Sequence, residues 1–213
     1  MEPDAVEIRV LGCLVEKQHA TPDAYPLSLN ALRLACNQST NRDPVVDYDE
    51  ATVSEALRRL ALRGWTRLTS GAGSRARKYR QLMPEALGVD AGELALLGVL
   101  MLRGAQTPGE LKQRSERLHR FEDLAAVEAA LAGLIGRGHV AQLPRQPGQK
   151  EERYAQLLAV SSTISVSTGA CGRPPRLTRN EPVTTSRNPT TVQKVTGSPR
   201  TRAPATTATA GLR

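Results

Sequence analysis

The feature that most constrains this chain is an internal duplication. The segment DAVEIRVLGCL at 4–14 matches DAGELALLGVL at 90–100, a separation of 86 residues. Further on, VSEALRRLALRG at 53–64 matches VEAALAGLIGRG at 127–138, where the separation is only 74. A repeat of this kind predicts two copies of one small unit. The first copy therefore holds twelve extra residues between its first and third helices.

Each copy shows the same order of local signals. In the first copy Asp4 and Glu7 can form a capping pair that opens a helix. Residues 53–60 carry apolar side chains at helical spacing and are followed by Gly64, a helix-ending residue. A short strand, a loop and a second strand at Tyr79 complete the unit. The second copy repeats these signals at Asp90, Glu93, Thr107, Pro108, Val127, Leu131, Leu134, Gly138 and Tyr154.

Three helices followed by a two-stranded hairpin describe a winged helix. We expect a mainly α fold with small β-hairpins, an α+β class, built from two tandem winged-helix (helix-turn-helix) domains at 1–83 and 84–159. Beyond residue 160 the sequence turns to Ser, Thr, Pro and Arg, which predicts a disordered tail at 160–213. That tail holds eight Lys or Arg residues and one acidic residue, out of a formal net charge of +8. The two domains together are therefore nearly neutral.

Several classes of protein are disfavoured. No apolar run approaches the roughly 20 residues of a membrane-spanning helix, and the acidic start MEPDAVEIRV lacks the pattern of an export signal. The sequence therefore predicts a cytoplasmic protein without membrane contact. The three cysteines, Cys13, Cys36 and Cys171, form no CxxC pair. Neither a disulfide framework, nor a zinc site, nor any other metal or cofactor is expected.

Long motifs run through both copies. They are LGCLVEKQ at 11–18, TPDAYPLSLNALRLACNQ at 21–38, NRDPV at 41–45, SRARKY at 74–79, LRGAQTPGEL at 102–111, LPRQPG at 143–148 and ERYAQLL at 152–158. These motifs resemble the YceH-like family of bacterial proteins, and the resemblance covers about residues 5–158. It implies a tandem winged-helix fold in a bacterial cytoplasm and brings no activity with it. The tail beyond residue 160 has no counterpart in that family.

The segment LACNQSTNRDPVVDYD at 34–49 joins the second and third helices of the first copy. Cys36 has no neighbouring His to act as a base, and it continues the apolar spacing of its helix, which favours a buried structural thiol. The carboxylates of the segment lack the glycine of a calcium loop. We expect Asp47 or Asp49 to cap the third helix instead.

Turn geometry leaves part of this loop unexplained. Asn37 is expected to end the second helix and Asp43 to form a turn, but no local rule calls for an arginine at position 42. A contact with a protein partner or a small ligand is the alternative for four residues. These are Asn37, Asn41, Arg42 and Asp43.

Basic residues concentrate in the first copy. Residues 50–80 hold eight Lys or Arg and two acidic residues. Residues 122–153 hold four Lys or Arg and five acidic residues. In a helix-turn-helix protein the third helix enters the major groove while flanking basic groups hold phosphates. We therefore predict that the first copy contacts double-stranded DNA. The predicted DNA-binding residues are Thr52, Ser54, Arg58, Arg59, Arg63, Arg75, Arg77, Lys78 and Arg80.

The sequence thus favours a DNA-binding protein with a regulatory or chromosome-associated role, and not an enzyme. The second winged helix would then serve self-association, as a homo-oligomer, or docking of a protein partner. The alternative is an adaptor for protein interactions that does not bind DNA. A purely structural interpretation of the third helix also stands, in which its arginines form a solvated face and Glu55 pairs with Arg59.

Overall fold

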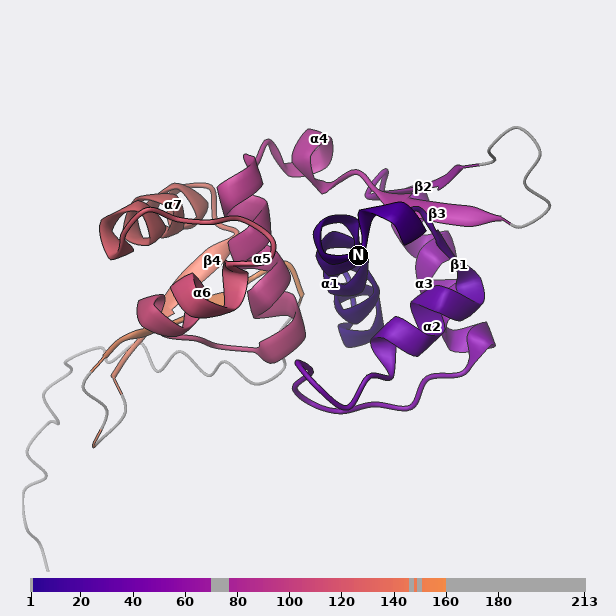
Figure 1. The fold of residues 1–213 in the computed structure, drawn as a ribbon, viewed down its shortest axis with the longest axis horizontal. Helices are drawn as coiled ribbons and strands as arrows, with labels where there is room; N and C mark the ends of the chain where they lie inside the picture. The colour runs from indigo at the N-terminus through magenta and orange to yellow at the C-terminus, as the bar shows by residue number, and fades with distance from the viewer. Residues whose placement is uncertain (1, 70–76, 146–147, 149–150, 160–213) are drawn as a thin grey trace, which may run out of the picture. The chain divides into compact units, whose positions relative to one another are not determined.

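The computed structural model describes residues 2–69, 77–145, 148 and 151–159 (Figure 1). The expectations for Arg75 and for the tail at 160–213 lie outside these residues. The described residues form helices and small antiparallel sheets, which confirms the expected α+β class. None of the helices described is long and apolar enough to cross a lipid bilayer.

Each copy contains the three helices and the two-stranded hairpin that the repeat predicts, and three further short elements were not predicted. The first copy contains α1 (Ala5–Ala20), the 3₁₀ turn η1 (Pro22–Ala24), β1 (Leu27–Ser28), α2 (Leu29–Cys36), α3 (Glu50–Leu62), β2 (Thr66–Thr69) and β3 (Lys78–Gln81). The second copy follows the short helix α4 (Met83–Leu87) and contains α5 (Ala91–Arg103), α6 (Pro108–Ser115), α7 (Leu124–Gly136), β4 (Val140–Leu143) and β5 (Arg153–Gln156).

Both capping pairs form as expected. Asp4 Oδ1 accepts from the Glu7 amide at 2.8 Å, and Glu7 Oε2 accepts from the Asp4 amide at 3.0 Å. Asp90 and Glu93 make the same two bonds at the start of α5. Each box satisfies helix-terminal amides that would otherwise lack a partner. Identical chemistry therefore fixes where the first helix of each copy begins.

The twelve extra residues of the first copy fall in two places. The separation between copies is 86 residues at α1 and α5, 79 at the starts of α2 and α6, and 74 at the starts of α3 and α7. Seven extra residues therefore precede α2, where η1 and β1 lie, and five lengthen the loop between α2 and α3. The first insertion changes the sheet, because β1 joins it in the order β1-β3-β2.

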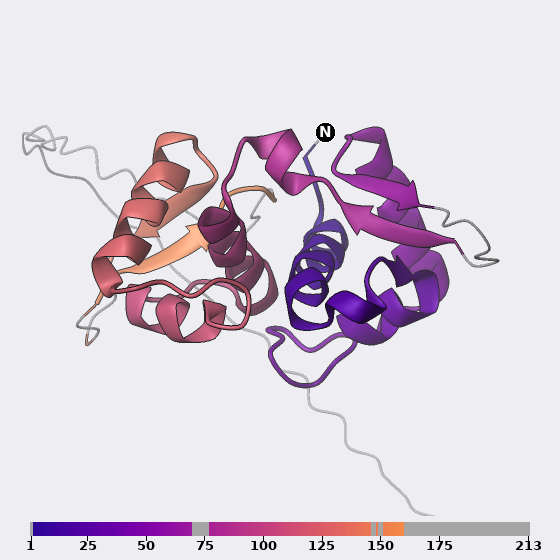
Figure 2. The same ribbon diagram turned by 45° about the horizontal axis from the view of Figure 1, so that its top comes forward.

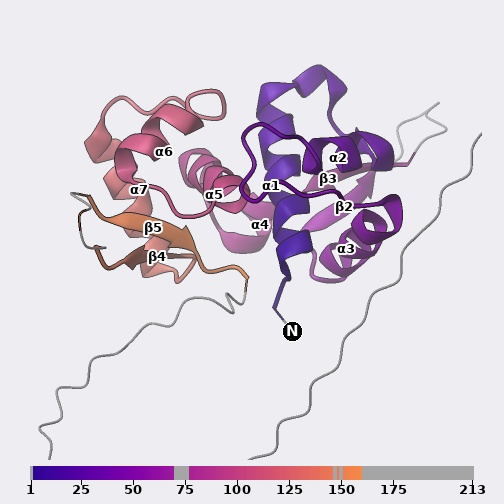
Figure 3. The ribbon, with the colours of Figure 1, turned by 90° about the horizontal axis from the view of Figure 1, so that it is seen from below.

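The sheets of the two copies share one register. In the first, Leu27 of β1 lies opposite Tyr79 of β3. In the second, a single bridge between Gln106 and Tyr154 takes the place of that strand, and β4 pairs with β5 as β2 pairs with β3. Figure 3 shows the strands β2 and β3 beside α3, with which β2 is in contact.

The first helices of the two copies, α1 and α5, pack side by side (Figures 1 and 2). Glycines at the contact allow the close approach. A Cβ at Gly12 would lie 2.9 Å from Leu102 Cδ2, and a Cβ at Gly98 would lie 2.9 Å from Val15 Cγ1. Both helices are apolar over most of their circumference and are largely buried, as expected of helices packed on several sides. They form the centre of one core shared by both copies.

Candidate nucleic-acid interface

The loop between α2 and α3 sets the direction of α3. Asn37, the C-cap of α2, donates from Nδ2 to Asp47 Oδ1 at 3.1 Å and to the Tyr48 carbonyl at 2.8 Å, and its Oδ1 accepts from the Tyr48 amide. Asp49 caps α3 by accepting from the Thr52 amide at 2.7 Å. Hydrogen bonds from Thr52 lower the pKa of Asp49. Of the two carboxylates considered for the cap, Asp49 serves that role and Asp47 ties the loop to α2.

Arg42 occupies the interior of the same loop. Its side chain is 0% exposed and makes five hydrogen bonds. Two of these run to Glu16 on α1, at 3.2 and 2.6 Å, and the others reach the carbonyls of Ala35 and Asn41 and the side chain of Gln38. The guanidinium therefore holds the loop against α1 and α2, which is a reason for the arginine that local sequence rules could not supply.

The remaining loop residues attach to the second copy. Asn41, which has a φ of 60°, accepts a hydrogen bond at Oδ1 from Arg103 on α5. The amide of Asp43 donates to the carbonyl of Leu102 at 2.8 Å. The loop thus connects α1, α2 and α5. Of the four residues considered for a partner or ligand contact, only Asn41 and Asp43 are exposed.

Arg58 and Arg59 on α3, and Arg63 directly after it, differ in their surroundings. Arg58 is exposed, with 62% of its side chain accessible, and donates to Glu55 at 2.7 and 2.8 Å. These bonds raise the pKa of Arg58 and lower the pKa of Glu55. Arg59 instead donates to Asp4 Oδ2 at 2.6 Å. The local pair therefore joins Glu55 to Arg58, whereas the sequence had suggested Arg59.

Arg63 follows α3 and has a structural role that the second copy repeats. Its Nε lies 3.4 Å from the buried carboxylate of Glu7. The equivalent residues of the second copy, Arg137 and Glu93, also form an ion pair. Because this pair occurs in both copies, including the one with an acidic third helix, we assign it to the fold. Arg59 has no such counterpart, since the equivalent position is Gly133.

The hairpin of the first copy presents a basic face. Arg67 of β2 lies directly opposite Arg80 of β3, and Thr69 lies opposite Lys78. Side chains alternate across a strand, so all four point to the same side of the sheet. Both arginines are exposed. The carboxylate Oε1 of Glu85, which is also exposed, lies 3.8 Å from Arg80 Nη2. We call the set Arg67, Thr69, Lys78 and Arg80 the basic hairpin face.

The hairpin of the second copy lacks this face. At the positions equivalent to Arg67 and Arg80 it pairs Ala141 with Ala155, and Leu143 lies opposite Arg153. The outward side of α7 is likewise apolar, with Leu124 and Ile135 exposed at 43% and 39%. Of the three basic residues on the hairpin face of the first copy, the second copy therefore keeps only the one equivalent to Lys78, which is Arg153.

The remaining predicted residues lie around the basic hairpin face and α3. Ser54 is exposed one helical turn before Arg58, Thr52 is half-buried at the cap of α3, and Arg77 is exposed just before β3. Sequence reasoning counted Arg67 within the charge of the first copy but did not select it. The signal that finds it is the alternation of β2 together with the register against Arg80. Among the described residues no cluster of His, Cys, Asp or Glu suits a metal ion.

Comparisons with known proteins cover both copies. The sequence profile of a family described as "Protein of unknown function, DUF480" matches residues 4–149. A UPF0502 protein of Citrifermentans bemidjiense is 52% identical over 164 residues, which is 76% of either chain. The UPF0502 protein of Geotalea daltonii is 54% identical over 156 residues, 72% of this chain and 71% of its own. That of Klebsiella pneumoniae (strain 342) is 47% identical over 171 residues, 77% of this chain and 79% of its own. The matches confirm that the motifs mark a bacterial family.

Proposed function

We propose that this chain, which belongs to the DUF480 family, binds double-stranded DNA through its first copy. The proposal treats both copies as winged helices, with α3 as the groove-facing helix and the basic hairpin face as a phosphate contact. A regulatory or chromosome-associated role would follow from such binding. The observation that carries the proposal is the pairing of Arg67 with Arg80 across two strands.

Two like charges directly opposite each other destabilise a sheet, by a few tenths of a kcal/mol up to about 1 kcal/mol. The second copy shows that the fold accepts Ala141 and Ala155 at these positions. An arginine pair there is therefore not required by the fold. It is explained if an anion binds across both guanidinium groups, and a DNA backbone supplies such anions at regular spacing.

The third helix supports the same assignment in part. Ser54 and Arg58 are four residues apart and both exposed, so they share a face of α3 that can reach base edges or phosphates. Arg58 also pairs with a carboxylate, but both it and Glu55 are exposed and can separate in water. Arg59 and Arg63 contribute less, because their side chains are less exposed and pair with Asp4 and Glu7. The proposed contact set is therefore Ser54, Arg58, Arg67, Arg77, Lys78 and Arg80.

The test compares two double variants of the full chain in duplex DNA titrations followed by fluorescence anisotropy. Arg67→Gln with Arg80→Gln removes two charges from the basic hairpin face. Arg120→Gln with Arg145→Gln removes two charges from exposed positions of the second copy and is the matched control. Both pairs leave the basic tail unchanged, so that the contribution of the tail cancels.

We expect the first pair to weaken binding and to reduce the slope of log affinity against log salt by about two, roughly one for each lost phosphate contact. The control pair should leave that slope near the wild-type value. Thermal unfolding should show the Arg67 and Arg80 variant to be as stable as wild type or more so. An equal loss of DNA affinity in both double variants, or no salt-dependent binding by the wild-type chain, would refute the proposal and favour the adaptor interpretation.

A further inference from the structure

A cleft of about 630 Å³ opens where the two copies meet, away from the basic hairpin face. Its walls come from the ends of α1 and α5, from α6 and the residues after it, and from the loop between α2 and α3. Val99, Leu102 and Leu118 supply apolar surface, and Gln38 and Asn41 supply amides. The volume falls within the range of small-molecule sites. The lining is more polar than apolar, so a ligand would meet charged and amide groups over most of the wall and apolar side chains over the rest.

The cleft carries an excess of positive charge. Four basic side chains line it, Lys17, Arg103, Arg114 and Arg117, against the two carboxylates Glu16 and Glu116. Glu16 already accepts two hydrogen bonds from the buried guanidinium of Arg42. Lys17 also lies 3.4 Å from Glu16, and Arg114 lies 3.2 Å from Glu110. Among the described residues, Arg103 and Arg117 are therefore the cations of the cleft without a carboxylate partner.

Arg103 is the central cation of the cleft. Its one described side-chain acceptor is the neutral amide oxygen of Asn41, although a guanidinium offers five donors. Burial, and then the nearby charge of Arg114, lower the pKa of Arg103. Two guanidinium groups in one recess repel each other unless an anion lies between them.

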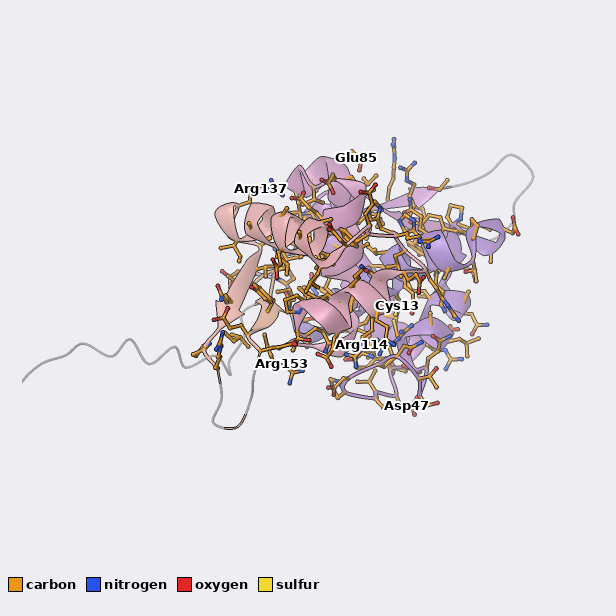
Figure 4. The ribbon with its side chains drawn as sticks, turned by 60° about the vertical axis from the view of Figure 1, so that its left-hand side comes forward. Cys13, Asp47, Glu85, Arg114, Arg137 and Arg153 are labelled. Carbon is orange, nitrogen blue, oxygen red and sulfur yellow. The ribbon has the colours of Figure 1, made fainter. Side chains whose placement is uncertain are left out.

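A second cavity of about 500 Å³ adjoins the first and shares Asn41, Arg103 and Arg114 with it. Arg153 of β5 lines that cavity, and both Arg114 and Arg153 approach Glu110, at 3.2 and 3.8 Å. Figure 4 shows Arg114 on α6 and Arg153 on β5. Arg103 and Arg114 thus stand where the two cavities meet, and a ligand held there would contact both copies.

We propose that the cleft binds a small organic anion whose phosphate or carboxylate group is held by Arg103, Arg114 and Arg117. The apolar part of the ligand would lie against Val99 and Leu102. Planar guanidinium groups bind both kinds of oxyanion through paired N–H donors. Because the site joins α5 and α6 to the loop that directs α3, its occupancy would act on both copies together.

The test uses phenyl phosphate, benzoate and inorganic phosphate as probes in calorimetric titrations of the full chain at fixed ionic strength. We expect an aromatic anion to bind at least about tenfold more tightly than inorganic phosphate, because the apolar wall contributes to binding. A preference for phenyl phosphate or for benzoate would identify the oxyanion. Backbone amide NMR shifts should map the bound anion to Asn41, Gly98 and Arg103.

Three variants locate the site. Arg103→Gln and Arg117→Gln should each weaken binding by about tenfold, the loss expected for one charge-assisted hydrogen bond. Arg117 is exposed, so its substitution leaves the fold intact. Arg145→Gln, at an exposed position outside the cleft, should leave the affinity unchanged. Unchanged affinity in both cleft variants, loss only in Arg145→Gln, or no binding of any probe would overturn the proposal. None of these outcomes depends on whether the chain binds DNA.

Discussion

Replacement of Arg42 by Met tests whether the loop between α2 and α3 depends on a buried ion pair. The side chains of Arg42 and Glu16 are 0% and 14% exposed, and their closest atoms are 2.6 Å apart. Removing one partner of a buried pair leaves the other charge without compensation, which typically costs about 3 to 5 kcal/mol. In a chain of this size each kcal/mol lowers Tm by roughly 2 to 4 °C, so we expect a decrease of roughly 6 to 20 °C.

The pH dependence of this effect follows from Glu16. Burial alone would raise its pKa, but the hydrogen bonds and charge of Arg42 outweigh burial and lower it. In the wild-type protein the pair therefore stabilises the fold above about pH 4.3, the usual pKa of an unfolded Glu, and this stabilisation is lost as the pH falls through the lower folded value. In Arg42→Met the opposing cation is gone and Glu16 protonates at higher pH. The difference in Tm between the two proteins should therefore narrow between pH 7 and pH 4.

Calorimetric or circular dichroism melts of the wild-type protein and three variants provide the assay. Arg58→Met is the matched control, because its ion pair with Glu55 is exposed and its loss should lower Tm far less than the loss of the buried pair. Arg42→Met combined with Glu16→Leu should recover part of the lost stability, since no unpaired charge remains. An Arg42→Met protein within about 1 kcal/mol of wild type at pH 7 would refute this account of the loop.

Three further predictions concern the repeat and the core. Asp90→Ala removes the capping box of α5 and should cost about 1 kcal/mol in urea-unfolding experiments; an unchanged midpoint would contradict a capping role. Gly98→Ala places a Cβ within 2.9 Å of α1 and should cost roughly 1 to 3 kcal/mol by overpacking, whereas a gain in stability would mean that the two helices are less closely packed. Cys13 and Cys36 are buried. In a Cys171→Ser variant, in which these are the remaining thiols, we expect reaction with a maleimide only in denaturant. Labelling of the native variant, seen by mass spectrometry, would show that this part of the core opens.

Signals that act over a few residues were predictable from the sequence. The capping pairs, the burial of Val53, Leu57 and Leu60, and the helix-ending role of Asn37 depend on neighbouring residues and helical spacing. The order of helices and strands followed from the repeat, because two copies with the same apolar pattern must bury it in the same way. These regularities determine most of the fold.

The surroundings of the charged residues were not predictable. Arg59 pairs with Asp4, 55 residues away, and Arg63 pairs with Glu7, 56 residues away. Local residue spacing does not predict contacts over such separations. Arg42 could not be placed for the same reason, since its partner Glu16 lies 26 residues away. Only strand register brings Arg67 opposite Arg80. Sequence therefore indicates how much charge each copy carries, and tertiary contacts decide which charges remain available to bind.

The contact between α1 and α5 has a reciprocal form. Val15 and Met101 are equivalent positions of the repeat, as are Gly12 and Gly98. A Cβ at Gly98 would lie 2.9 Å from Val15 Cγ1, and a Cβ at Gly12 would lie 3.1 Å from Met101 Cβ and 2.9 Å from Leu102. One glycine contact is therefore repeated in both directions, as at a two-fold symmetric dimer interface. Two copies of one unit can thus pack through equivalent positions of their first helices, so a single polypeptide contains the kind of contact by which identical subunits pair.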